Sequence, residues 1–370
     1  MRAIGSPATY DRPGRGTGPQ ANPTPAAQVS PGGPAGPSPT KPTSKGRWWA
    51  TPFVALMLMS PFVGELLSGS SPPLEFLNPF SLFFLVGLYG CGAVLIREAT
   101  HRWGKGWPTL VALGIAYGIV EEALMVKSWF DPGWMDLGDM AWYGRWWGTN
   151  WVWAEGLTIF HAVFSIYISI ALVDVMFPAR RHERWVSDRT LVLLLAWISF
   201  VTVLGALFMS GYRPGTGPYV LAVVAAVALI ALAWRLPVQL WHPRASRTPT
   251  PGGFYLLGAI WGTVFFLAFF SSPSSGLPAV AVMALMAVYT LVGFLVVLWT
   301  SGGGENWTDR HRLAFAGGAL TFLLFLDFAI GIGNPASLML LAGIAGIALL
   351  AWEWRRLGTD HPSPHQGRLD

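Results

Sequence analysis

Residues 108–127 read PTLVALGIAYGIVEEALMVK, an apolar stretch that carries two adjacent glutamates near its end. Twenty residues rise about 30 Å as an α-helix, which matches the thickness of the hydrocarbon core of a bilayer. The stretch therefore predicts a membrane-spanning helix with Glu121 and Glu122 inside the membrane. Ionisable residues in such a position are costly to bury, so they indicate a functional site by default.

The composition of the whole chain agrees with a membrane protein. Of 370 residues, 53% are hydrophobic and only 12% are charged, and the mean hydropathy is +0.46. A soluble protein of this length needs more charge to cover its surface, so the bilayer is the solvent for most of the chain. The net charge of +5 is spread in short clusters between apolar runs, which indicates topology and not nucleic-acid binding.

The metal-binding residue types show no pattern that predicts a metal site. Cys91 is the single cysteine and gives neither a disulfide nor a cysteine-based metal site. Most histidines fall between the apolar runs or in the tails without ligand spacing. No metal site is predicted, and the sequence leaves the cofactor unknown.

Apolar runs of spanning length predict an all-α, polytopic transmembrane helix bundle with ten spans. They lie at about 48–68, 76–97, 108–127, 151–177, 190–211, 218–239, 254–271, 277–299, 311–330 and 336–354. Basic residues follow every second span, so the positive-inside rule places both termini in the cytoplasm. We expect a multi-pass protein of the cell inner (plasma) membrane.

The two ends of the chain differ from this helical part. Residues 1–46 contain ten prolines and almost no aliphatic residues, which predicts a disordered cytoplasmic tail. Residues 47–356 form the predicted transmembrane domain, and residues 357–370 form a second disordered tail. Within the domain, polar residues concentrate in 108–177, whereas 190–356 are mostly an apolar scaffold.

The glutamates lie on a face that small residues mark as a helix contact. Gly114, Gly118 and Glu122 follow one another at intervals of four residues, so they share one face of the helix. Small residues at this spacing let membrane helices approach closely. We therefore expect this face to point into the bundle and not toward lipid.

The next span, residues 151–177, carries a polar stripe. Thr158, His161 and Ser165 follow at helical spacing, and Glu155 lies one turn before Thr158. His161 is about 15 Å from the start of its span, a depth similar to that of the glutamates. Antiparallel helices joined by one loop are usually neighbours, so we expect Glu121 or Glu122 to meet His161.

Adjacent residues on an α-helix point about 100° apart, so the two glutamates should not share one direction. We expect one to line the site and the other to pair with a cation or hydrogen-bond donor. Lys127 and Arg145 are the candidate cations near the outer surface. A structural cluster that only holds the helices together is the simpler alternative.

The same residues resemble the CAAX-protease and bacteriocin-processing (CPBP) family of intramembrane proteases. That family carries EExxxR on one span, FxxxH on the next and a further His, often with Asn, on a later span. Here EEALMVK supplies the glutamate pair with Lys127 one residue beyond the Arg position, and Leu157 replaces Phe ahead of His161. Asp327 or Asn334 would have to replace the missing third histidine. The wider chain resembles an uncharacterised bacterial multi-pass membrane-protein family.

The resemblance implies an intramembrane peptidase in which a glutamate activates water. Glu121 would be the general base and His161 would polarise the scissile carbonyl or carry the proton, with Glu122 as the third catalytic residue. Two other hypotheses remain open. The cluster would serve a proton-coupled transporter of a small solute, or it would lock the helices of a non-catalytic scaffold or accessory protein. The expected partners are the lipid bilayer and either a peptide or a small solute.

Overall fold

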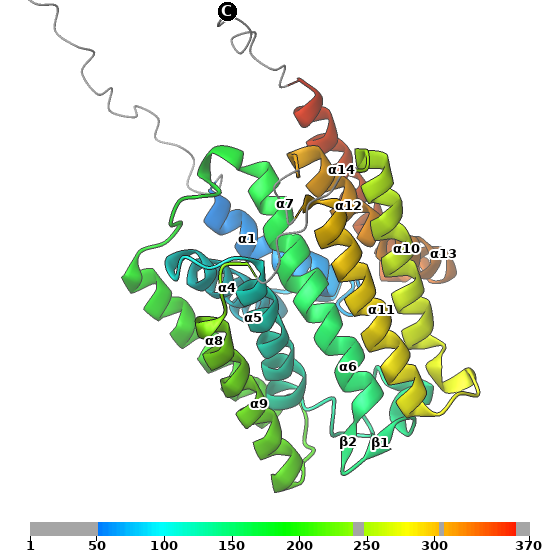
Figure 1. Cartoon of the computed structure of the whole chain (residues 1–370). Helices are drawn as coiled ribbons and strands as arrows, with labels where there is room; N and C mark the ends of the chain where they lie inside the picture. The colour runs from blue at the N-terminus through cyan, green and yellow to red at the C-terminus, as the bar shows by residue number, and fades with distance from the viewer. Residues whose placement is uncertain (1–50, 240–247, 303–306, 360–370) are drawn as a thin grey trace, which may run out of the picture. The chain divides into compact units, whose positions relative to one another are not determined.

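The computed structural model describes residues 51–239, 248–302 and 307–359, and these form an all-α polytopic helix bundle (Figure 1). The predicted tail at 1–46 lies outside the described residues, as does 360–370, whereas the last helix continues to Thr359. Within the described residues the β-structure is one antiparallel hairpin, β1 (Arg145–Trp146) and β2 (Thr149–Asn150).

The helices fall into two runs along the chain. The first run comprises α1 (Pro52–Pro61), η1 (Phe62–Leu66), α2 (Pro73–Phe76), α3 (Pro79–Leu85), η2 (Val86–Gly90), α4 (Cys91–Arg102), α5 (Trp107–Ile119), η3 (Val120–Met125), η4 (Gly138–Ala141), α6 (Trp151–Phe160), η5 (His161–Ile168), α7 (Ser169–Met176) and η6 (Pro178–Arg180). The second comprises α8 (Asp188–Phe208), α9 (Thr216–Arg235), α10 (Pro251–Phe270), η7 (Ser272–Ser274), α11 (Ala279–Thr300), α12 (Asp309–Ala319), α13 (Thr321–Gly333), η9 (Pro335–Ser337) and α14 (Met339–Thr359).

Among the described residues, seven helical segments are long and apolar enough to cross a membrane, or eight if α12 and α13 form one bent span. The number of ten spans is therefore not confirmed, although the described part of each predicted stretch is mostly helical. The segment Pro52–Leu66 is too short to count, and α12 meets α13 at a bend of 41°. Helix α14 is not counted as a span either, because it carries three charged residues near its end, Glu353, Arg355 and Arg356. The placement of both termini in the cytoplasm remains a prediction.

The polar spans occupy the interior of the bundle. In α5–η3 and in α6–η5–α7, 72% and 67% of the residues in the most apolar stretch are buried, compared with 17% in α8, 17% in α9 and 11% in α11. The exposed residues of these last three helices are mostly apolar, which suits contact with lipid. These three helices are thus the more exposed part of the bundle, and their role as a scaffold stays a prediction.

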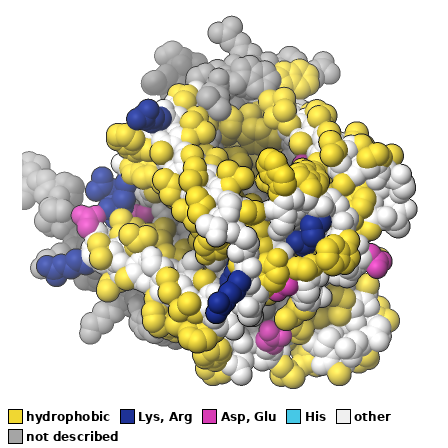
Figure 2. All heavy atoms as spheres, turned by 90° about the horizontal axis from the view of Figure 1, so that it is seen from below, with side chains coloured by type: hydrophobic (Ala, Val, Ile, Leu, Met, Phe, Trp, Pro, Cys, Tyr) yellow, Lys and Arg dark blue, Asp and Glu magenta, His cyan; other side chains and the backbone are white. Residues whose placement is uncertain are grey.

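The connection between α5–η3 and α6 is a folded cap. It contains η4 and the β-hairpin. Asn150, the last residue of the hairpin, links η4 to helix α6. The side chain of Asn150 accepts a hydrogen bond from the backbone N–H of Trp153 at 3.0 Å and donates one to the Met140 carbonyl at 2.6 Å. Viewed from this end, the surface is largely hydrophobic with separate charged side chains (Figure 2).

A buried ion-pair network lies at the opposite end of α4. Glu98 is fully buried and accepts hydrogen bonds from Arg97 at 2.7 Å, Arg102 at 3.0 Å and the backbone N–H of Trp185 at 2.9 Å. The Arg97 guanidinium also lies 3.7 Å from the centre of the Trp185 ring. The network fixes the loop between η6 and α8 to the end of α4.

Candidate functional site

Helices α5 and α6 pack closely along the predicted glycine face. A Cβ atom placed on Gly118 would lie 3.1 Å from the Cα of Thr158 and 3.3 Å from the Cβ of His161, and one on Gly114 would lie 3.1 Å from the Cα of Ala162. Only a residue without a side chain allows the two backbones to come this close. The glycine face therefore sets the approach of the helices at the depth of His161.

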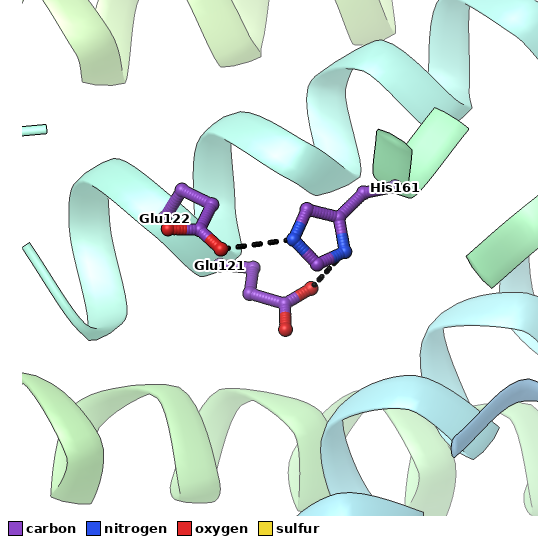
Figure 3. A group of neighbouring side chains, drawn as sticks. All are labelled: Glu121, Glu122 and His161. Carbon is purple, nitrogen blue, oxygen red and sulfur yellow. Dashed lines mark hydrogen bonds and ion pairs between the residues drawn. The ribbon is translucent and has the colours of Figure 1, made fainter. Parts of the chain in front are cut away.

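At this depth, the imidazole of His161 lies between two carboxylates (Figure 3). Its Nε2 atom is 2.9 Å from Oε1 of Glu122, and its Nδ1 atom is 3.1 Å from Oε2 of Glu121. The exposed fractions of Glu121, Glu122 and His161 are 4%, 7% and 2%, so the group is shielded from solvent and lipid. The three residues predicted to be catalytic, Glu121, Glu122 and His161, are therefore adjacent in the structure.

Hydroxyl groups orient this cluster from both sides. Ser165, one turn after His161, lies 3.1 Å from Nδ1 of the imidazole, in agreement with the predicted polar stripe. Ser128 donates a hydrogen bond to Oε2 of Glu122 and accepts one from the indole N–H of Trp153 at 3.0 Å. Ser128 lies in the cap, so no helical spacing pointed to it.

A third carboxylate approaches from the first helix. Glu65 accepts a hydrogen bond from Tyr89 at 2.5 Å and another from Ser71 at 2.8 Å. The Tyr89 ring centre is 5.9 Å from that of His161. Glu65 was not among the predicted site residues. It could have been, because it is an acidic residue within an apolar segment, PFVGELL, as Glu121 is.

Two tyrosines complete the surroundings of Glu121. The side chains of Tyr89 and Tyr117 both interact electrostatically with its carboxylate. The carboxylate oxygen that faces His161, Oε2, lies 3.1 Å from Nδ1 of the imidazole, and the Tyr117 hydroxyl interacts with the same carboxylate. The imidazole and both phenols therefore surround one buried carboxylate.

Every π-helical segment of the described residues carries part of this cluster. Glu65 lies on η1, Tyr89 on η2, Glu121 and Glu122 on η3, and His161 begins η5. A π-helical turn is wider than an α-helical turn and is frequent at functional sites. The wider turn accounts for a difference from our expectation, because both glutamates contact the same imidazole instead of pointing apart.

Lys127 does not pair with the glutamates. The chain leaves the helix at Lys127, which has a left-handed backbone conformation with φ of 62°. Its ammonium group donates hydrogen bonds to the carbonyls of Ser210 at 2.9 Å and Tyr212 at 3.1 Å. It therefore ties the cap to the end of α8, which corrects the expected ion pair.

Arg145 also binds carbonyl groups within the cap, those of Ala141 at 2.8 Å and Phe130 at 2.7 Å. Burial lowers the pKa of this guanidinium, which lies outside the spans. Within the described residues neither cation forms an ion pair with Glu121 or Glu122. The expected pairing of Arg145 is thus corrected as well.

The other candidate residues lie apart from the imidazole. Thr158 packs against Gly118 through its backbone, and both carboxylate oxygens of Glu155 are buried without a hydrogen-bond partner among the described residues. Asp327 is fully buried on α13, near Gly343 of α14, and Asn334 is exposed at the end of α13. No contact in the described part of the chain joins Asp327 or Asn334 to the cluster. Glu65 and Tyr89 are the further polar residues beside it.

The cluster has the residue types of a cation site. One ligand atom each from Glu121, Glu122 and His161 lie within 4.8 Å of one another, all buried. Imidazole and carboxylate ligands suit divalent transition metals. The same groups are also suited to general acid–base chemistry, because they can exchange protons over short distances.

The comparisons with known proteins identify a family and no activity. No curated protein and no solved structure matches the chain. The model of one family, described as an uncharacterized membrane protein family, matches residues 54–358, which include nearly the whole helical part and every residue of the cluster. The chain belongs to this uncharacterized membrane protein family.

Proposed function

We propose that this membrane protein is an intramembrane hydrolase that cleaves an amide bond of a membrane-embedded peptide. The observation that carries the proposal is the buried carboxylate of Glu121, whose Oε2 atom lies 3.1 Å from Nδ1 of His161. A carboxylate in this position can accept a proton from water while the imidazole stabilises the resulting charge. The resemblance to CPBP proteases suggests the amide bond as the target.

Glu122 acts as a positioning residue in this proposal. Its Oε1 atom lies 2.9 Å from Nε2 of His161, and its other oxygen is held by the hydroxyl of Ser128. A carboxylate that fixes one imidazole nitrogen leaves the other free to exchange a proton. The Nδ1 atom, on the side of Glu121, is then the proton-transferring atom.

Tyr117 provides a donor for the developing oxyanion. Its hydroxyl is buried beside the carboxylate of Glu121, and the residue lies one helical turn before Glu121. A preorganised donor in a site shielded from water stabilises a tetrahedral intermediate. The family resemblance alone did not supply this group.

The hydrogen-bond pattern favours this proposal over the two alternatives. Ser128 links Glu122 to Trp153 at the start of α6, and Ser71 holds Glu65 just after η1. A transmembrane proton path would need a chain of such groups toward both membrane surfaces. A purely structural cluster would not need a carboxylate on each side of one imidazole.

The test is proteolysis by the purified protein in lipid nanodiscs. Membrane proteins of the expression host are supplied as substrates, and new N-termini are detected by mass spectrometry. Glu121→Gln and His161→Ala are expected to lower cleavage at least about 100-fold, and Tyr117→Phe about 10- to 100-fold. Glu155→Gln is the matched control, because it removes a buried carboxylate on α6 outside the cluster.

Equal cleavage by Glu121→Gln and the wild type would refute the proposal. Failure of the wild type to generate any new N-terminus, together with Glu121-dependent proton flux in liposomes, would favour the transporter. Loss of thermal stability as the only effect of the variants would favour the scaffold.

A further inference from the structure

The cluster holds more negative charge than its surroundings compensate. Glu121 and Glu122 flank one imidazole and Glu65 interacts electrostatically with them, and no Lys or Arg forms an ion pair with these three within the described residues. Lys127 and Arg145, which were expected to pair with the glutamates, instead donate hydrogen bonds to backbone carbonyls, after α8 and within the cap respectively. Burying several carboxylates without a counter-charge is costly, so either protons or a bound cation must neutralise them.

The distances within the cluster match those between neighbouring ligands of a transition metal. Ligand atoms about 2.1 Å from an ion, at angles of 90–109° to one another, lie about 3.0–3.4 Å apart. The distance from Oε1 of Glu122 to Nε2 of His161 is 2.9 Å, whereas Oε2 of Glu121 lies beside the other ring nitrogen and would have to move toward Nε2. The whole set fits within 4.8 Å, so small side-chain movements would bring three ligands onto one ion.

The groups behind these ligands are those that a metal site requires. A metal-bound histidine usually donates its other ring N–H to an oxygen, and Ser165 offers its hydroxyl to Nδ1 at 3.1 Å. A metal-bound carboxylate is usually hydrogen-bonded as well, and Ser128 donates to the oxygen of Glu122 that faces away from the imidazole. Within the described residues, Glu121 has no Lys or Arg partner, so its carboxylate is available to an ion.

We propose that Glu121, Glu122 and Nε2 of His161 bind one divalent first-row transition ion, Mn²⁺, Fe²⁺ or Zn²⁺. Two carboxylates and one imidazole favour these ions, whereas Mg²⁺ and Ca²⁺ prefer oxygen ligands alone. The three residues were predicted to meet, but no metal was predicted, because their spacing along the chain matches no metal-binding motif.

This inference deepens the proposed function, because it names a cofactor for the same cluster. A bound ion would lower the pKa of a water ligand and polarise a carbonyl group. One carboxylate oxygen of Glu121 would bind the ion, and the other would remain to accept a proton from water. Metal binding is nevertheless measured without any substrate, so the two proposals can fail separately.

The test uses the full chain, purified in detergent and stripped with a strong chelator. Co²⁺ is then titrated in as a spectroscopic probe, and bound metal is counted by mass spectrometry after removal of free ion. We expect one ion per chain and visible cobalt absorption bands in the wild type. Glu122→Gln and His161→Asn should lose both, whereas Glu155→Gln should bind as the wild type does.

Ser128→Ala provides a variant that keeps all three ligands, in case loss of a ligand prevents folding. Removal of the hydrogen bond to Glu122 is expected to weaken Co²⁺ binding about 10- to 100-fold. Absence of bound ion in the wild type, or equal binding by Glu122→Gln, would overturn the metal site. Cleavage by metal-free wild type would overturn the metal cofactor and leave the hydrolase proposal in place, whereas stoichiometric binding without cleavage of any peptide would do the reverse.

Discussion

Gly118 is the position at which a single added methyl group tests the packing of the site. Its Cβ would lie 3.1 Å from the Cα of Thr158 and 3.3 Å from the Cβ of His161. Ordinary contacts between carbon atoms are about 3.5–4.0 Å, so an alanine must move the two helices apart by about 0.5 Å. Because the Glu122–His161 hydrogen bond is 2.9 Å long, the same movement would stretch it beyond the normal range.

The expected loss of stability follows from two opposing contributions. Overpacking costs about 1–3 kcal/mol, whereas alanine in a helix is about 1 kcal/mol more favourable than glycine. Gly118→Ala should therefore destabilise the protein by about 1 kcal/mol. Gly118→Val adds two further methyl groups with little gain in helix propensity, so we expect about 2–3 kcal/mol. At about 2 °C per kcal/mol, Tm should fall by about 2 °C and about 5 °C.

The assay is thermal unfolding in detergent, followed by tryptophan fluorescence. Gly333 at the exposed end of α13 provides the matched control, because a Cβ atom there would meet nothing within 4 Å. Gly333→Ala and Gly333→Val should leave Tm within about 1 °C of the wild type, in keeping with the small effect of most surface substitutions. The reasoning would be refuted if Gly118→Val melted no lower than Gly333→Val and retained full Co²⁺ binding.

Three further substitutions test individual features of the fold. Lys127→Met should cost about 1–3 kcal/mol in detergent melts by leaving two carbonyls unpaired, yet retain Co²⁺ binding, and loss of the ion would contradict the observed contacts. Glu98→Gln should lower the free energy of unfolding by about 3–5 kcal/mol, because it breaks a buried ion-pair network. The control is Glu183→Gln, which removes an exposed ion pair with Arg180 and should change stability by less than about 1 kcal/mol. Similar Tm values for the two variants would disprove the role of the network. Asp327→Leu should raise Tm, because it removes a buried carboxylate without a hydrogen-bond partner among the described residues, and a lower Tm would show that this side chain has a partner of its own.

The approach of Glu122 to His161 was predictable from local sequence. The helical period places Gly114, Gly118 and Glu122 on one face, and a single loop joins their helix to the next. Both facts depend only on neighbouring residues and on the length of a span. The glycine contacts with Thr158 and Ala162 confirm that this face lies between the two helices.

The number of crossings was harder to predict, because hydropathy does not report where a helix bends or ends. The segment Pro52–Leu66 stops after 15 residues, and the break at Leu320 divides α12 from α13. Hydropathy averages over about one span, so a helix that stops partway resembles one that crosses.

The remainder of the cluster was decided by tertiary structure alone. Glu65 and Tyr89 precede His161 by many residues, and only the packing of the first helices beside η5 brings them to the imidazole. The π-helical turns depend on backbone hydrogen-bond register, which residue type does not specify, and they direct both glutamates toward one histidine. Lys127 was assigned the wrong partner for a related reason, since charge indicates that a cation needs an acceptor but not which carbonyl or carboxylate the fold places within its range. Hydrophobicity and helical period are local properties, so they were enough to predict a helical membrane protein with an acid and an imidazole on neighbouring spans. Which groups surround that pair was decided by contacts between distant segments.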